Sequence, residues 1–104
     1  LGAFSNFGPR SVHIGAPGVR VFSTVVADQY SDAIFEKFGL KVYWDGTSMA
    51  TPHVAGAAAL YWSAHPHLSY KEVKEAILSS AKKIPALTGK TATGGKLDVK
   101  ELMN

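Results

Sequence analysis

The segment from Thr47 to Ala64 is the feature that most constrains how this 104-residue chain can fold. Alanine and larger apolar residues occupy most of its positions and leave no wide polar face. A helix of this composition has to be covered by other segments on nearly all sides. Proline is tolerated at a helix start, where N–H groups lack an intrahelical acceptor, so Pro52 indicates a start within a few residues of Ser48. We therefore expect a buried helix that ends at His65-Pro66.

The residues before this helix predict short strands. Val12–Ala16 and Val19–Val26 are rich in β-branched and apolar residues, and the second run is apolar enough to be covered on both faces. Leu40–Trp44 predicts a strand that leads into the turn before the long helix. Within Asp28–Gly39, the apolar residues Ile34, Phe35 and Phe38 have helical spacing, and the final glycine could cap a helix. This pattern predicts a short helix.

The residues after the long helix predict two further helices and a loop. Ser69 and Glu72 have the spacing of a capping box, and one apolar stripe follows them: Val73, Ile77, Leu78 and Ala81. Asp98 is expected to cap a last short helix, and Gly89–Gly95 is expected to be a loop. Strands followed by helices, with a strand–turn–helix in the middle, indicate an α/β layer fold.

Length and composition exclude several classes of protein. A chain of 104 residues forms at most one domain, and a hydrophobic content of 46% is typical of a packed globular piece. The longest apolar stretch, Val54–Trp62, is too short to span a bilayer, and no targeting segment is visible. The absence of cysteine excludes a disulfide scaffold and a cysteine-ligated zinc site.

The net charge of +3 does not indicate a nucleic-acid partner. Most of the lysines lie in the last third of the chain, with glutamates among them on predicted helical faces. A nucleic-acid-binding module would cluster arginine and lysine with aromatic residues between them. We therefore interpret the scattered lysines as a solvated surface.

Ser48 stands where a glycine turn meets the long helix. A hydroxyl there can point out of the fold while the residue's own N–H faces developing negative charge, as acyl transfer requires. A helix-capping serine is the alternative role. Residues 46–56 favour the first role, because at every fixed position they resemble the subtilisin-like serine protease motif, Gly-Thr-Ser-x-Ala-x-Pro-x-x-Ala-Gly. The α/β-hydrolase motif does not fit, because its fifth position is glycine and Ala50 stands here.

The resemblance covers nearly the whole chain except about Ala27–Tyr43, where the family usually has a shorter, polar loop. The similar segments are Phe4–Gly8, Ile14–Val19, Phe22–Thr24, Leu60–Ala81 and Gly95–Val99. The resemblance implies a doubly wound α/β fold with a central parallel sheet and flanking helices. It further implies that residues 1–104 are the carboxyl-terminal part of a single subtilisin-like peptidase domain.

The resemblance also implies a serine endopeptidase that works through an acyl-enzyme, with Ser48 as nucleophile and its backbone N–H as one oxyanion donor. In the family, the catalytic aspartate and histidine and the oxyanion asparagine precede the serine segment, and none of their motifs is visible here. We therefore expect the chain to be inactive alone, to need the amino-terminal part of the domain as a partner, and to act on peptides or proteins. The alternative is a truncated or pseudoenzyme fragment with a binding role only.

Five other residues were candidates for a site. Trp44 matches a family position on the leaving-group side of the cleft, although a plain core aromatic is an equally good interpretation. His53 matches a non-catalytic histidine and is interpreted as structural, and Asn6 is not the family's oxyanion asparagine. His65 and His67 form a weaker case for a metal pair than for an exposed turn.

No cofactor is expected for the reaction itself, and no metal-binding residue is predicted. Members of the family often bind structural calcium, but no Asp-rich ligand loop can be assigned in this chain. The resemblance implies a secreted or lumenal protein.

Overall fold

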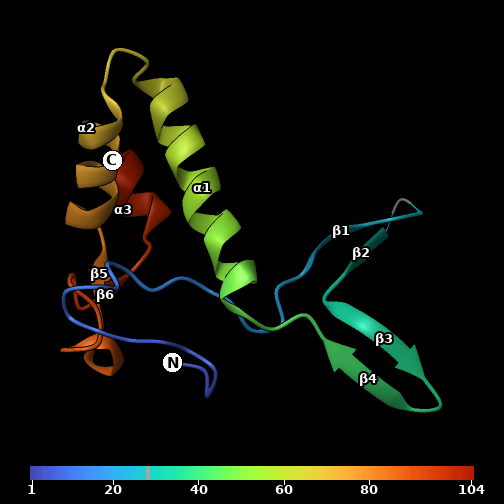
Figure 1. The fold of residues 1–104 in the computed structure, drawn as a ribbon. Helices are drawn as coiled ribbons and strands as arrows, with labels where there is room; N and C mark the ends of the chain where they lie inside the picture. The colour runs from blue at the N-terminus through green and yellow to red at the C-terminus, as the bar shows by residue number, and fades with distance from the viewer. Residues whose placement is uncertain (28) are drawn as a thin grey trace.

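The computed structural model describes residues 1–27 and 29–104, and they include a helical part and a hairpin arm (Figure 1). The helical part, residues 47–104, contains α1 (Thr47–Ala64), α2 (Tyr70–Ser79) and α3 (Val99–Met103). It also contains two short strands and one 3₁₀ turn: β5 (Lys82–Lys83), β6 (Gly95–Lys96) and Pro85–Leu87. The hairpin arm, residues 23–43, contains four strands: β1 (Ser23–Val25), β2 (Gln29–Ser31), β3 (Ala33–Lys37) and β4 (Leu40–Tyr43).

Helix α1 confirms the predicted start and end of the long apolar segment. It begins at Thr47 and ends at Ala64, and His65 caps it by donating its backbone N–H to carbonyls of the last turn. Pro52 lies in the second turn rather than the first, so its missing N–H removes an intrahelical bond to the Ser48 carbonyl. The reason given from the sequence for tolerating Pro52 was therefore incomplete.

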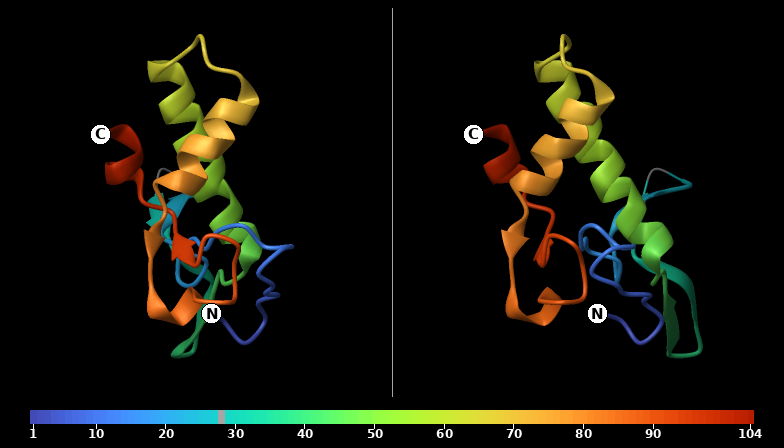
Figure 2. Two further views of the ribbon diagram at one scale, coloured as in Figure 1. Left: turned by 90° about the vertical axis from the view of Figure 1, so that its left-hand side faces the viewer. Right: turned by 60° about the vertical axis from the view of Figure 1, so that its left-hand side comes forward.

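The core of the helical part lies where α2 and α3 pack against α1. In both views of Figure 2, α2 returns beside α1 from the connection that joins the two helices. Four side chains are buried in this core: Ala57, Val73, Ile77 and Leu102. Of these four residues only Ala57 belongs to α1, and the α1 side chains of Leu60 and Trp62 are exposed. The described residues therefore do not supply the cover on nearly all sides that the composition of α1 predicts.

Two predicted helix caps are confirmed. Ser69 accepts a hydrogen bond from the Glu72 N–H, and the Glu72 carboxylate accepts one from the Ser69 N–H at 2.7 Å, so the capping box is complete. Asp98 accepts a hydrogen bond from the Glu101 N–H at 3.0 Å and caps α3. Helix starts at these positions follow from local side-chain chemistry.

The short helix predicted within Asp28–Gly39 is wrong. Gln29–Ser31 and Ala33–Lys37 are strands, and Asp28 lies outside the described residues. Phe38 and Gly39 both have positive φ, 55° and 77°, which is the backbone of a tight hairpin turn between β3 and β4. Gly39 therefore serves the turn and not a helix end.

The predicted strand at Val19–Val26 is shorter than expected and lies on the surface. Only Ser23–Val25 form β1, all three residues are exposed, and they pair antiparallel with β2. Among the described side chains of the hairpin arm, none is buried. The interior strand that the apolar run predicted does not form within the described residues.

The strand predicted at Val12–Ala16 does not form, and the run makes one isolated parallel bridge, between Gly15 and Lys96. Hydrogen bonds join the same run to the carboxyl-terminal loop, with the Ala92 N–H donating to the Val12 carbonyl and the Thr93 N–H to the His13 carbonyl. Among the described residues, this bridge is the one parallel pairing, and the three two-stranded sheets are antiparallel.

The described helices lack the combination of length and hydropathy required to cross a membrane.

Candidate active site

Ser48 is exposed in the first turn of α1, where the hairpin arm joins the helical part (Figure 1). The turn before it is held by a close approach of two glycines, since the Gly46 N–H donates to the Gly18 carbonyl at 2.7 Å. A Cβ on Gly18 would lie 2.7 Å from the Gly46 carbonyl oxygen, so no side chain fits there. The contact of Gly18 with Gly46 thus holds the turn that leads into the serine.

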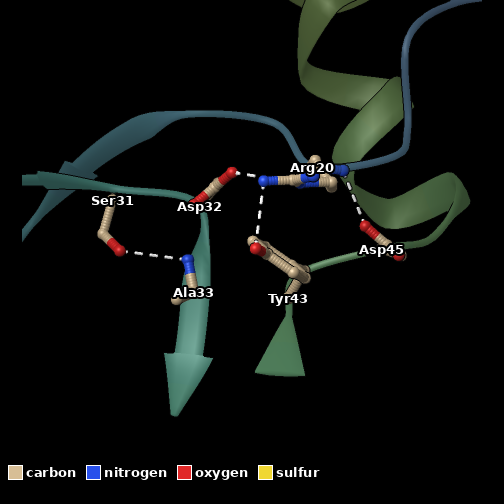
Figure 3. Close-up of polar contacts among 6 residues, drawn as sticks. All are labelled: Arg20, Ser31, Asp32, Ala33, Tyr43 and Asp45. Carbon is tan, nitrogen blue, oxygen red and sulfur yellow. Dashed lines mark hydrogen bonds and ion pairs between the residues drawn. The ribbon is translucent and has the colours of Figure 1, made fainter. Parts of the chain in front are cut away.

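Arg20 connects the same turn to the hairpin arm (Figure 3). Its backbone N–H donates to the Asp45 carboxylate at 2.6 Å, and its guanidinium donates to the Tyr43 hydroxyl at 3.0 Å. The guanidinium also lies 4.0 Å from the centre of the Tyr43 ring and 3.6 Å from the Asp32 carboxylate. We call these four residues, Arg20, Asp32, Tyr43 and Asp45, the arginine cluster.

Sequence reasoning missed the arginine cluster. No motif joins its members, and Asp32 and Tyr43 lie in the stretch where the resemblance fails. A basic residue beside a turn glycine is a common surface feature, so no local signal would have identified it.

An open hollow of about 530 Å³ lies beside Ser48 and is mostly apolar. We call it the serine hollow. The hairpin arm and the segments flanking it contribute Val21, Phe22, Ser23, Thr24, Val25, Ser31 and Trp44, and α1 contributes Ser48, Met49, Pro52 and His53. The structure therefore brings Trp44 and Ser48 to one surface, as expected if Trp44 lines a cleft rather than a core.

His53 also lines the serine hollow, but its ring is engaged by its own helix. Nδ1 lies 3.0 Å from the Met49 carbonyl and donates a hydrogen bond to it. This contact agrees with the structural role expected for His53. None of the side chains that line the hollow is a carboxylate.

The remaining candidates lie away from the serine hollow. His65 donates through Nδ1 to the Tyr61 carbonyl at 3.1 Å, and the rings of His65 and His67 are 6.5 Å apart. Within the described ranges, no three or more histidine, cysteine or acidic residues converge to hold a metal ion. Asn6 is exposed and is not among the residues that line the hollow.

The arrangement at Ser48 can supply two parts of acyl-transfer chemistry. The exposed hydroxyl is available to a carbonyl carbon in the serine hollow, and the positive end of the 18-residue helix α1 lies at the same place. A serine hydroxyl is a weak nucleophile until a base accepts its proton.

Comparison with known proteins identifies the family. The sequence model of the Subtilase family, peptidase S8, matches residues 1–99. Subtilisin-like protease 1 of Plasmodium vivax is 32% identical over 91 residues, which is 88% of this chain and 13% of that protein. Subtilisin DY of Bacillus licheniformis is 40% identical over 79 residues, which is 76% of this chain and 24% of that protein.

A solved structure supports the same assignment. The A-subunit of the AB5 toxin from E. coli superposes with a TM-score of 0.73 at 29% identity, covering 93% of this chain and 28% of that subunit. The predicted α/β subtilisin-like fold is therefore confirmed, and the chain spans between 13% and 28% of each of these proteins. The chain belongs to the subtilase family of serine proteases.

Proposed function

We propose that this chain supplies the nucleophile of a subtilisin-like serine endopeptidase, and that Ser48 is this nucleophile. One observation carries the proposal: the serine of an intact eleven-residue motif is exposed at the start of α1 and opens into the serine hollow. The N-cap position of α1 is Gly46, and no side-chain hydrogen bond caps the helix, so Ser48 does not have the capping role. Subtilase membership supports protein substrates at the level of the family.

In the proposed reaction, a base takes the Ser48 hydroxyl proton as Oγ attacks the carbonyl carbon of a peptide bond. The carbonyl oxygen becomes an oxyanion that the Ser48 backbone N–H can stabilise. The base then gives the proton to the leaving amine, the C–N bond breaks, and an acyl-enzyme remains on Oγ. Water, deprotonated by the same base, releases the acyl group as a carboxylic acid. These steps require side chains, backbone donors and water.

We further propose that residues 1–104 are the carboxyl-terminal part of one peptidase domain and that the base comes from the rest of that domain. The lining of the serine hollow supports this, because it contains no carboxylate that could pair with its one histidine, His53. The aligned region is also a small part of each relative, 13% of one and 24% of another. The apolar surface of α1, including Leu60 and Trp62, would then be covered by the remainder of the domain.

Active-site labelling tests the proposal. The full-length gene product that carries this chain is treated with a fluorophosphonate probe at neutral pH, and the modified residue is located by mass spectrometry. We expect an adduct on Ser48, and Ser48→Ala is expected to abolish it. Ser48→Ala should also lower kcat for peptide hydrolysis by about 10⁶, the loss seen when the nucleophile of subtilisin itself is removed.

Ser63→Ala is the matched control, because Ser63 is a second exposed serine on α1 whose hydroxyl donates to the Leu60 carbonyl at 2.8 Å. This variant should label and cleave normally. Absence of any adduct on Ser48 in the folded full-length protein would refute the nucleophile role and favour the binding-only alternative.

A further inference from the structure

The hairpin arm forms one side of the serine hollow. Val25 of β1 and Ser31 of β2 line it from the arm, and Trp44, directly after β4, lines it where the arm ends. Ser48 and Met49 of α1 lie on the other side. A substrate that reaches Ser48 through this hollow therefore meets side chains of the arm.

The chemistry of the lining favours an apolar substrate group. No acidic or strongly basic side chain lines the hollow, and several large apolar groups do: Val21, Phe22, Val25, Trp44, Met49 and Pro52. Phe22 and Trp44 are also substantially exposed, so covering them would remove apolar surface from water. A charged substrate side chain would lose its hydration there without gaining an opposite charge. The serine hollow has a volume of about 530 Å³, which is in the range of small-ligand pockets and is large enough for a large side chain.

The arginine cluster holds this wall against the serine turn. Arg20 contacts Asp32, between β2 and β3, and Tyr43, the last residue of β4, so one side chain spans both hairpins (Figure 3). Its backbone N–H contacts Asp45, which immediately precedes the motif that carries Ser48. Trp44 adds a second connection, because its N–H donates to the Asp32 carbonyl at 2.9 Å.

Arg20 contributes geometry rather than charge alone. A 3.6 Å ion pair near the surface is weak by itself, but a planar guanidinium that stacks on a ring and donates to its hydroxyl fixes an orientation. Arg20 also has a φ of 51°, a left-handed conformation that non-glycine residues adopt rarely. Its contacts with Asp32, Tyr43 and Asp45 hold this conformation.

We propose that the hairpin arm is a substrate-selecting wall for a large apolar side chain near the scissile bond, and that Arg20 is the positioning residue that keeps this wall beside Ser48. The inference rests on the proposed protease function and names the class of substrate that the same site prefers. Val25 is the residue that contacts the substrate side chain, and Arg20 acts through the arm without contacting it.

A charge introduced at Val25 tests the wall. The full-length gene product is assayed with fluorogenic peptides in which each position around the scissile bond is varied among phenylalanine, alanine and lysine. With Val25→Asp, the ratio of kcat/KM for lysine over phenylalanine should rise roughly tenfold or more at one position and stay unchanged at the others. A gain for lysine cannot arise from misfolding, because the ratio does not depend on the amount of active protein.

Val26→Asp is the matched control. Val26 is the next residue and is 89% exposed, whereas Val25 is 37% exposed, and Val26 does not line the serine hollow. Its variant should keep the preference of the parent protein. An equal effect of the two variants, or no effect of Val25→Asp at any position, would overturn the inference.

Arg20→Ala tests the positioning role. It should reduce the preference for phenylalanine over alanine roughly tenfold at the same position that Val25→Asp affects, mainly through KM. Arg20→Lys, which keeps the charge but loses the planar fork, should restore only part of it. The positioning role would be contradicted if Arg20→Ala changed the preference at a different substrate position. It would also be contradicted if Arg20→Lys restored the preference for phenylalanine in full.

Titration of each variant with the fluorophosphonate separates the two proposals. If Ser48 of the parent protein is not labelled, the proposed function fails and this inference fails with it. If Ser48 is labelled and the preferences do not respond to Val25→Asp or Arg20→Ala, only the substrate-selecting wall is refuted.

Discussion

The helical part and the hairpin arm meet at Gly46, but they differ in what holds them. In the helical part, three helices share a small core in which Val73, Ile77 and Leu102 are buried. In the hairpin arm, two antiparallel pairs leave none of their described side chains buried, and the connection to the turn before α1 runs through the arginine cluster and backbone hydrogen bonds. Burial therefore stabilises one part, and directional polar contacts orient the other.

This difference indicates a division of labour. Packed helices give the start of α1 a defined position, because removing apolar side chains from water contributes about 1.5–3 kcal/mol for each large one fully buried. Ion pairs near the surface, such as Arg20 and Asp32, contribute about 0–1 kcal/mol. The helical part is thus suited to hold Ser48, and the hairpin arm to vary around it.

The largest expected difference between the two parts comes from one substitution made in each. Ile77→Ala in α2 should lower the free energy of unfolding of the full-length gene product by about 2–5 kcal/mol, because Ile77 is only 5% exposed. Ile34→Ala in β3 removes the same atoms from a side chain that is 53% exposed, and should cost less than about 1 kcal/mol. Urea unfolding measures both, and equal losses would mean that the arm is packed as firmly as the helices.

Gly18→Ala should damage the junction of the two parts. The added Cβ would lie 2.7 Å from the Gly46 carbonyl oxygen, so the turn before Ser48 must shift, at a cost of about 1–3 kcal/mol. We also expect slower fluorophosphonate labelling of Ser48. Normal labelling kinetics together with unchanged stability would show that the contact of the two glycines does not set the serine turn.

Gly56→Ala provides the comparison for Gly18, because a Cβ there meets no described atom within 4 Å. Helix propensity alone would then give a stabilisation of about 0.5–1 kcal/mol. We expect the full-length protein to lose stability instead, since the apolar composition of α1 predicts a close neighbour on this side. A thermal melt that rises for Gly56→Ala would show that this side of α1 faces solvent.

Ser69→Ala should cost about 1 kcal/mol by removing the side-chain cap of α2, and it tests how local the stability of the helical part is. Ser63→Ala, which removes a hydroxyl that donates only to the Leu60 carbonyl, should be neutral or slightly stabilising. Chemical unfolding of the two variants side by side measures the difference. If they behaved alike, the capping box would be structurally present but energetically unimportant.

The smallest effect is expected at Val26, directly after β1. Val26→Thr should change the unfolding free energy by less than about 0.5 kcal/mol, because Val26 is 89% exposed. Val73→Thr places the same hydroxyl in the core of the helical part and should cost about 1–3 kcal/mol. A large loss at Val26 would reveal that another part of the protein covers the hairpin arm.

Several elements could be predicted because their causes are local. The limits of α1, the capping box at Ser69 and the cap at Asp98 depend on residues a few positions apart, and the structure confirms all three. The motif around Ser48 was equally visible, and its catalytic role remains a prediction. The short helix within Asp28–Gly39 failed because apolar residues at helical spacing are also compatible with a strand when a partner strand is available.

The sequence by itself determined the family resemblance, the long apolar helix and the position of Ser48 at its start, because each depends on neighbours in the chain. Only the tertiary structure decided that Gly18 lies against Gly46, that Arg20 connects Asp32, Tyr43 and Asp45, and that the hairpin arm lines the serine hollow. Gly18 and Gly46, the hydrogen-bonded pair among these that is farthest apart in the sequence, are separated by 28 positions. Local propensity carries no information about which distant partner a polar side chain or a strand will meet, so only the folded arrangement reveals them.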